Sequence, residues 1–186
     1  CGWCPCGGGH GGGHAGARDE VGRVKAAIAL QNIAHANPTV HGPAIRSEGG
    51  LRALMALMYE GSPREQEASA GALSALFEDP ASADSARGCV PALVTLLRSG
   101  SLMGRAMAAT ALQHLARHRA NRAEIVAEGA LGPLVDLVVS FMAPDRKGER
   151  VRGSASGAAA TLRHLALNPD SHKAIREKGG IPPLVA

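Results

Sequence analysis

One pattern recurs at long intervals along this 186-residue sequence, and it constrains the fold more than any other feature. A first segment has an alanine, a leucine three residues later and another aliphatic residue after three more. A second segment has an aliphatic residue followed by leucines at the same steps. The first occurs at Ala27-Leu30-Ile33, Ala70-Leu73-Leu76, Ala109-Leu112-Leu115 and Ala159-Leu162-Leu165, and the second at Leu51-Leu54-Leu57, Val90-Leu93-Leu96, Leu131-Leu134-Leu137 and Ile181-Leu184. Steps of three place these side chains on one helix face, so the sequence predicts stacked helical repeats.

A glycine stands two residues before each second segment, at Gly49, Gly88, Gly129 and Gly179. A helix that ends abruptly needs a residue that tolerates positive φ, and glycine does so at the least cost. An isoleucine lies four residues before three of these glycines, but Asp84 takes that place before Gly88. Asn-Pro or Asp-Pro pairs at 37–38, 79–80 and 168–169 predict the start of a short helix. Each unit is therefore expected to hold a short, a medium and a long helix.

The composition favours an all-α core and excludes some classes of function. Hydrophobic residues make up 45% of the chain, and they are nearly all Ala, Leu, Val, Ile and Met, which argues against sheets. Aromatic residues are only 2%, so stacking on nucleic-acid bases is excluded, and the net charge of +4 is mild. No apolar run is long enough to span a bilayer.

Two stretches, 162–185 and 112–138, resemble junctions between armadillo repeats, and the resemblance covers about residues 19–186. It implies a right-handed α-solenoid of three-helix repeats. HEAT repeats usually lack this glycine turn, and tetratricopeptide and ankyrin units are shorter. We expect a repeat domain at 18–186, with a partial unit at 19–36, full units at 37–79, 80–118 and 119–168, and a partial unit at 169–186. The sequence begins at Cys1 and stops within an apolar pattern, so we expect a fragment.

The resemblance also implies a non-enzymatic protein-interaction scaffold that binds a protein partner or extended peptide along a concave groove lined by the long helices. In members similar to importin-α, an asparagine column and a tryptophan column hold a basic peptide. Here the asparagine column reads Asn32, Ala75, His114 and His164, and the tryptophan column reads Ile28, Gly71, Thr110 and Ala160. A nuclear import adaptor is therefore only an alternative, as is the substrate-binding arm of a larger ubiquitin ligase.

Polar residues on the same helix faces are the candidate groove residues. Arginine forks favour carboxylates, which points to an acidic ligand, although ordinary solvated helix positions give the same pattern. The residues are Gln31, Asn32, His35, Glu78, Gln113, His114, Arg117, Arg163 and His164. An insertion at 143–150 lengthens one unit and, with Arg152, forms either a basic patch or a solvated linker.

The amino-terminal residues 1–17 are rich in glycine, cysteine and histidine, and we expect a disordered tail; a zinc site is the alternative. Few, unevenly placed cysteines favour a reducing cytoplasmic or nuclear setting. Cys89 is expected to be a small buried hydrophobic residue. We find no nucleophile elbow, phosphate loop or metalloprotease helix. The sequence therefore predicts no enzyme, cofactor, metal, nucleic acid or small-molecule substrate.

Overall fold

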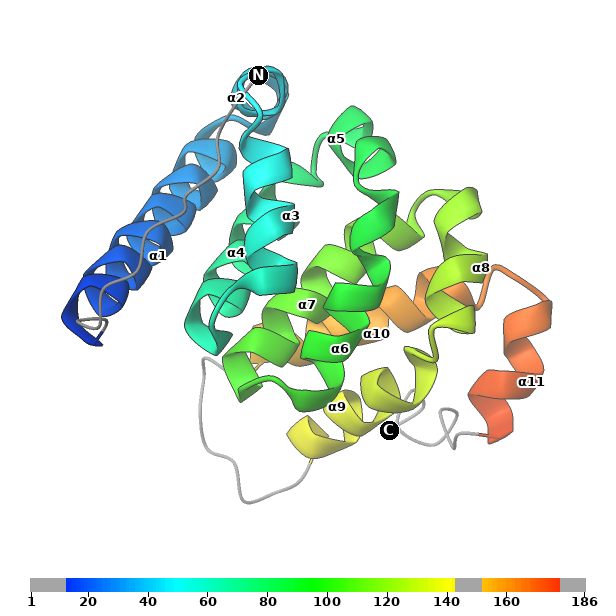
Figure 1. Ribbon diagram of the computed structural model, residues 1–186. Coiled ribbons are helices and arrows are strands. Elements are labelled where there is room, and N and C mark those ends of the chain that lie inside the picture. Colours follow the sequence, from blue (N-terminus) through cyan, green and yellow to red (C-terminus); the bar gives the residue numbers. More distant parts are fainter. Residues whose placement is uncertain (1–12, 143–151, 178–186) are drawn as a thin grey trace.

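The computed structural model describes residues 13–142 and 152–177, and this part of the chain contains helices and no strand (Figure 1). The short and medium helices are α2 (Pro38–Ser47), α3 (Gly50–Glu60), α5 (Pro80–Ser85), α6 (Val90–Ser99), α8 (Arg119–Ala127), α9 (Leu131–Met142) and α11 (Asp170–Glu177). The long helices are α1 (Gly13–Ala36), α4 (Pro63–Leu76), α7 (Leu102–Ala116) and α10 (Arg152–Leu165). A short 3-10 helix, Arg87–Cys89, precedes α6.

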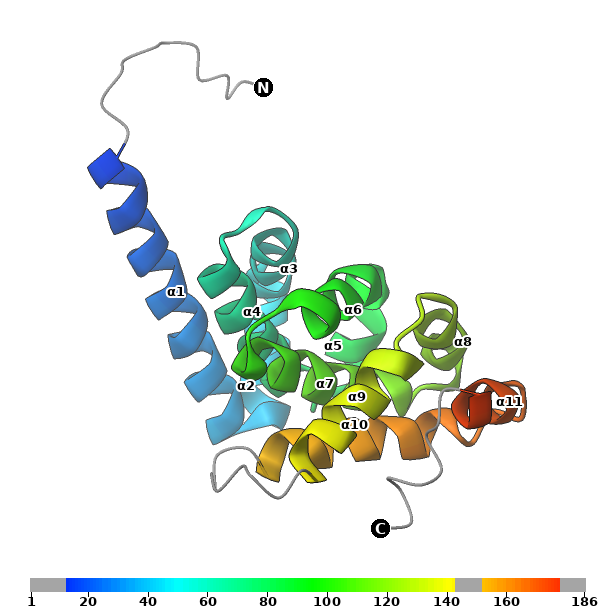
Figure 2. The same ribbon diagram turned by 90° about the horizontal axis from the view of Figure 1, so that it is seen from below.

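The long helices form one continuous layer. Helix α1 packs on α4, α4 on α7, and α7 on α10, and Figure 2 shows this succession from the blue α1 to the orange α10. The medium helices α3, α6 and α9 form a second row, in which each contacts the next. Equivalent helices therefore lie side by side along the chain, which confirms the predicted all-α solenoid.

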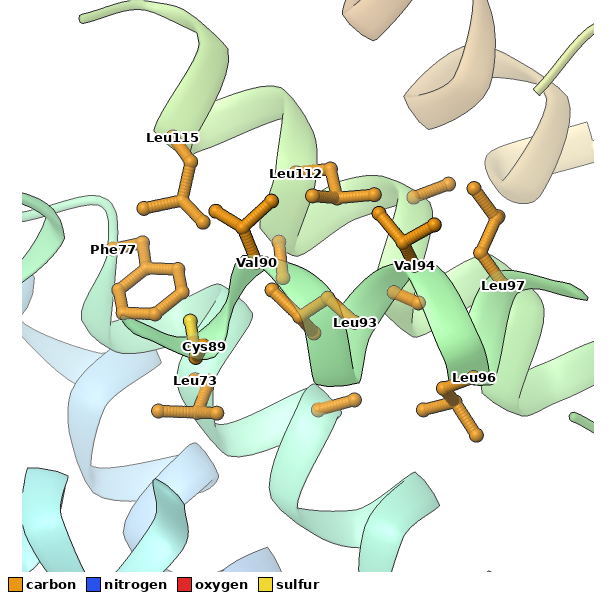
Figure 3. Close-up of a cluster of buried hydrophobic side chains, with 14 of the residues drawn as sticks. Leu73, Phe77, Cys89, Val90, Leu93, Val94, Leu96, Leu97, Leu112 and Leu115 are labelled. Atoms are coloured by element: carbon orange, nitrogen blue, oxygen red, sulfur yellow. The ribbon is translucent and has the colours of Figure 1, made fainter. Parts of the chain in front are cut away.

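The core lies between these rows, where the recurring aliphatic columns meet. Around α6, Leu93 and Leu97 are fully buried against residues from the preceding and following helices. Figure 3 shows Leu93 between Leu73 and Phe77 on one side and Leu112 on the other, and Leu97 further along α6. Each fully buried leucine contributes about 1.5–3 kcal/mol relative to an exposed one, so stacking supplies most of the stability.

Side-chain caps begin several helices. Asn37 accepts a hydrogen bond from the Val40 amide (3.3 Å), and Asp79 accepts one from the Ser82 amide (3.0 Å). Ser62 and Glu65 form a reciprocal capping box at the start of α4. Bonds to Arg23 and to the Ser62 backbone lower the pKa of the buried Glu65 carboxyl, which therefore stays charged.

The glycine corners differ from one another. Gly49 and Gly129 adopt positive φ values of 81° and 75°. Gly88 does not, which differs from our expectation, because it lies inside the 3-10 helix that joins α5 to α6. The reason is local: α5 is only six residues long, lacks the buried isoleucine, and runs into α6 through a tighter turn. The predicted corner at Gly179 lies outside the described residues.

Two boundaries also differ from expectation or stay open. Helix α1 begins at Gly13, so residues 13–17, which we expected in the tail, belong to the helix. The rest of the tail, with its cysteines, and the insertion at 143–150 lie outside the described residues. The unit boundaries stay a prediction. Within the part that the structure describes, no helix is long and apolar enough to cross a membrane.

Candidate functional site

The candidate residues share one surface of the long-helix layer. On α1, Ile28, Gln31 and His35 are spaced by three and four residues, so they lie on the same helix face. The equivalent positions on α4, α7 and α10 continue this surface across the stack. We call it the long-helix face; it includes the turn residues Glu78 and Arg117 that follow α4 and α7.

Histidines and a glutamate meet at the C-terminal ends of α1, α4 and α7. His35 Nδ1 lies 3.4 Å from Glu78 Oε1. Burial lowers the pKa of His114, the Glu78 carboxylate raises it, and the charges of Arg117, His35 and His164 lower it further. The His114 Nδ1 atom is buried and has no hydrogen-bond partner within the described residues. His114 is therefore neutral at pH 7 and carries an unused polar atom.

The end of this surface near α10 is basic. Burial lowers the pKa of His164, and the charges of Arg163, Arg122 and Arg117 lower it further, with no carboxylate acting in the opposite direction. Arg122 donates to the carbonyls of Ala116 (2.8 Å) and Arg117 (3.1 Å), so its guanidinium is held against the end of α7. Neither Arg117 nor Arg163 forms an ion pair with any residue that the structure describes. This end is suited to a carboxylate ligand.

A mainly apolar cavity of about 450 Å³ lies on the same surface, between the middle of α1 and the N-terminal parts of α4 and α7, and Gln31, Arg64 and Glu67 also line it. Its lining includes Val24, Ile28, Gly71, Met103 and Met107. We call it the Gly71 cavity. Ile28 and Met103 remain 43% and 42% exposed, which is unusual for large apolar side chains beside a core.

The structure joins six of the nine predicted residues into one polar cluster and leaves the others apart. The cluster consists of His35, Glu78, His114, Arg117, Arg163 and His164. Gln31 instead lines the Gly71 cavity, with its amide against Gly71. Asn32 is exposed and Gln113 is half-buried, and neither side chain forms a hydrogen bond within the described residues.

Sequence reasoning missed the methionines of the Gly71 cavity. Met103 and Met107 belong to neither column used to define the groove, and a methionine at helical spacing usually indicates core. The available signal was Gly71 itself, because a glycine within a helix costs about 1 kcal/mol relative to alanine and so suggests close approach. A Cβ at this position would lie 2.8 Å from Gln31 Oε1.

The described residues offer little for catalysis. Burial raises the pKa of the Cys89 thiol to about 12, so it stays protonated and unreactive at neutral pH. In residues 13–142 and 152–177, no three histidine, cysteine or acidic side chains lie together as metal ligands.

Comparison with known proteins agrees with this architecture. The model of the Armadillo/beta-catenin-like repeat family matches residues 88–117. An engineered protein of known crystal structure matches 90% of this chain with a TM-score of 0.74 and 28% identity. Residues 88–117 thus match an armadillo repeat, and the chain has the fold of armadillo repeat proteins. No curated protein matches the sequence significantly.

Other solved structures match this chain in fold. Computationally designed armadillo repeat proteins for modular peptide recognition have a TM-score of 0.71 and 21% identity, with coverage of 90% of this chain and 72% of theirs. A designed armadillo repeat protein in complex with the peptide (KR)4 has a TM-score of 0.70, 21% identity and the same coverage. The chain spans 66% of the first engineered protein and 65% of a second, which is a little under two thirds.

Proposed function

We propose that this protein is a non-enzymatic interaction module whose long-helix face is a groove that binds an acidic segment of a protein partner. The observation that carries the proposal is the pair of unneutralised guanidiniums, Arg117 and Arg163, beside His114 and His164. A partner segment that crosses the stacked repeats, whether extended or helical, contacts several units at once. A layer of long helices lying side by side offers such a surface.

The charge of the groove distinguishes it from a site for basic peptides. A designed armadillo relative binds (KR)4, but here Glu78 is the acidic member of the polar cluster and it already contacts His35. The tryptophan-column positions hold Ile28, Gly71 and Thr110, which offer no indole surface to pack a lysine or arginine stem. An acidic ligand therefore fits better than a nuclear-localisation peptide.

Peptide titration tests the proposal. A fluorescein-labelled decapeptide rich in glutamate and a labelled (KR)4 peptide are titrated with the 186-residue chain, followed by fluorescence anisotropy. We expect saturable binding of the acidic peptide that weakens as salt rises, because surface charges are screened. The double variant Arg117→Glu, Arg163→Glu removes that binding.

The control is Arg52→Glu on α3, an exposed arginine outside the long-helix face. It changes the net charge by as much as Arg117→Glu or Arg163→Glu alone, so an equal loss in Arg52→Glu and in either single variant would mean that only overall charge matters. Preferential binding of (KR)4 would overturn the acidic assignment and favour the import-adaptor alternative.

A further inference from the structure

The Gly71 cavity has no occupant from the described chain, although it lies on the surface proposed to bind a partner. It is mainly apolar, and its volume of about 450 Å³ is within the range of sites that bind ligand groups. Gly71 lies on α4 between Ile28 of α1 and Met107 of α7, so the missing side chain leaves the central helix flat. An apolar side chain of a partner fits this position.

The walls of the cavity can adapt to such a side chain. Methionine is flexible and polarisable, and Met103 and Met107 together form the α7 wall. The Gln31 amide rests against Gly71 by the far end of a flexible side chain. Burying a leucine- or phenylalanine-sized group here removes exposed apolar surface from both molecules.

The basic residues proposed to bind the partner's carboxylates lie at a fixed distance from this cavity. Met107 and Arg117 are ten residues apart, and at the helical rise this is about 15 Å along the axis of α7. About four to five residues of extended chain cover the same length. Arg163 and His164 lie beside Arg117 on the neighbouring α10, so a carboxylate at this distance meets an unneutralised basic cluster.

We propose that the bound partner is a two-part segment, with one large apolar side chain in the Gly71 cavity and carboxylates at Arg117 and Arg163, four to five extended residues away. This inference rests on the proposed function and adds the apolar contact and the spacing. The positive charge of Arg117 and Arg163 favours an acidic partner over one that offers only an apolar surface. The Gly71 cavity then favours those acidic segments that also carry a large apolar side chain.

The experiment compares labelled peptides on the 186-residue chain by fluorescence anisotropy. One set carries a leucine or phenylalanine followed, after four or five residues, by two glutamates; a second set has the reverse order; a third replaces the apolar residue by alanine. In at least one order, the two-part peptide binds about tenfold to a hundredfold more tightly than its alanine counterpart, as expected from burying one large side chain.

Variants of the cavity separate the two contacts. Met103→Asp places a negative charge in the cavity wall. The helix should still form, because Met103 lies in the first turn of α7, where an acidic residue is tolerated. It reduces the affinity for the two-part peptide to that for the alanine peptide. Val40→Asp, at a side chain 59% exposed on α2, is the matched control and leaves both affinities unchanged. Circular dichroism establishes that each variant is helical.

The outcomes distinguish this inference from the proposed function. Equal affinity for the two-part and alanine peptides overturns the apolar contact and leaves the acidic groove standing. The same conclusion follows if Met103→Asp and Val40→Asp behave alike. Absence of binding by every peptide overturns both proposals.

Discussion

The interior long helix α7 and the edge helix α1 carry the same apolar columns but bury them to different extents. Leu112 and Leu115 of α7 are fully buried, because α4 lies on one side, α10 on the other, and α6 covers them. On α1 the equivalent Leu30 is only partly buried and Ile33 is 45% exposed. Burial is therefore a property of a helix's place in the stack, and the pattern alone does not determine it.

The edge helix compensates in part with polar contacts. Arg23 of α1 pairs with the buried Glu65 of α4, and the Ser62 hydroxyl donates to Glu20 of α1 at 2.8 Å. Among the α1 side chains that the structure describes, from residue 19 onward, only the small Ala27 and Ala34 are buried. Helix α1 is thus held by close approach of alanines and by charge pairs, whereas α7 is held by large side chains on several sides.

The largest expected effect on stability comes from a substitution that disrupts the packing of the interior helix. Leu112→Ala leaves a cavity among fixed neighbours and should lower the free energy of unfolding by about 2–5 kcal/mol. The equivalent Leu30→Ala at the edge should cost clearly less, because part of that side chain is already in water. Urea unfolding followed by circular dichroism measures both. Similar losses at the two positions would contradict the comparison.

The fold could be predicted from the sequence because its signal is repeated. The aliphatic columns give helix faces, and their recurrence gives a stack, so an error in one unit is corrected by the others. The Gly88 corner shows the limit of this reasoning. The glycine was identified by its place in the repeat, but its conformation depends on the short α5 and on a buried Cys89.

The candidate site could be predicted only for its polar half. Column positions indicate which residues share a face, and this brought Glu78, His114 and Arg117 together. The Gly71 cavity arises from the absence of a side chain on α4 and from methionines one helix away. Such a space depends on the distance between neighbouring helices, which a one-dimensional pattern does not contain.

The next largest effect on stability is expected at the N-terminal caps of the long helices α4 and α7. Ser62 and Ser101 each accept a hydrogen bond from a backbone amide three residues on. Ser62→Ala and Ser101→Ala should each lower the free energy of unfolding by about 0.5–2 kcal/mol. Each substitution also removes a hydroxyl hydrogen bond to a glutamate of the preceding long helix, Glu20 of α1 for Ser62 and Glu67 of α4 for Ser101, so the two losses should be similar. A clearly smaller loss for Ser62→Ala, measured in urea, would show that the edge helix α1 gains less from its contact than α4 does.

A smaller, pH-dependent effect separates His114 from Asn32, which occupies the same column on the edge helix. Burial lowers the pKa of His114, so the folded state binds a proton less readily than the unfolded state. The contribution of the neutral histidine to stability is complete above the unfolded pKa near 6.5 and decreases as the pH falls toward the lower folded value.

His114→Asn should therefore flatten the fall in stability between about pH 6.5 and the lower folded pKa of His114, relative to the unaltered protein. Asn32→His should add no such slope, because its site is exposed. Urea midpoints at pH 7.5, 6.5 and 5.5 measure the difference. An unchanged slope in His114→Asn would mean that other groups cause the acid sensitivity.

The smallest expected effect on stability concerns Gly71, the α4 residue between the edge and interior helices. Alanine is favoured over glycine within a helix by about 1 kcal/mol. The added Cβ meets only the far end of the Gln31 side chain, at 2.8 Å, and that end can move. Gly71→Ala should therefore leave the free energy of unfolding unchanged or raise it by up to about 1 kcal/mol.

The same substitution should lower the affinity for the two-part peptide, because the methyl group and the displaced Gln31 amide both occupy the Gly71 cavity. Stability and affinity then change in opposite directions, which a general loss of structure does not produce. Ala68→Gly, at another α4 position lining the cavity, is the reverse control: it should lower stability by a similar amount and leave the affinity unchanged or higher. If affinity instead follows stability in both variants, the cavity is not where the partner binds, and the edge and interior helices contribute to binding only through the polar cluster.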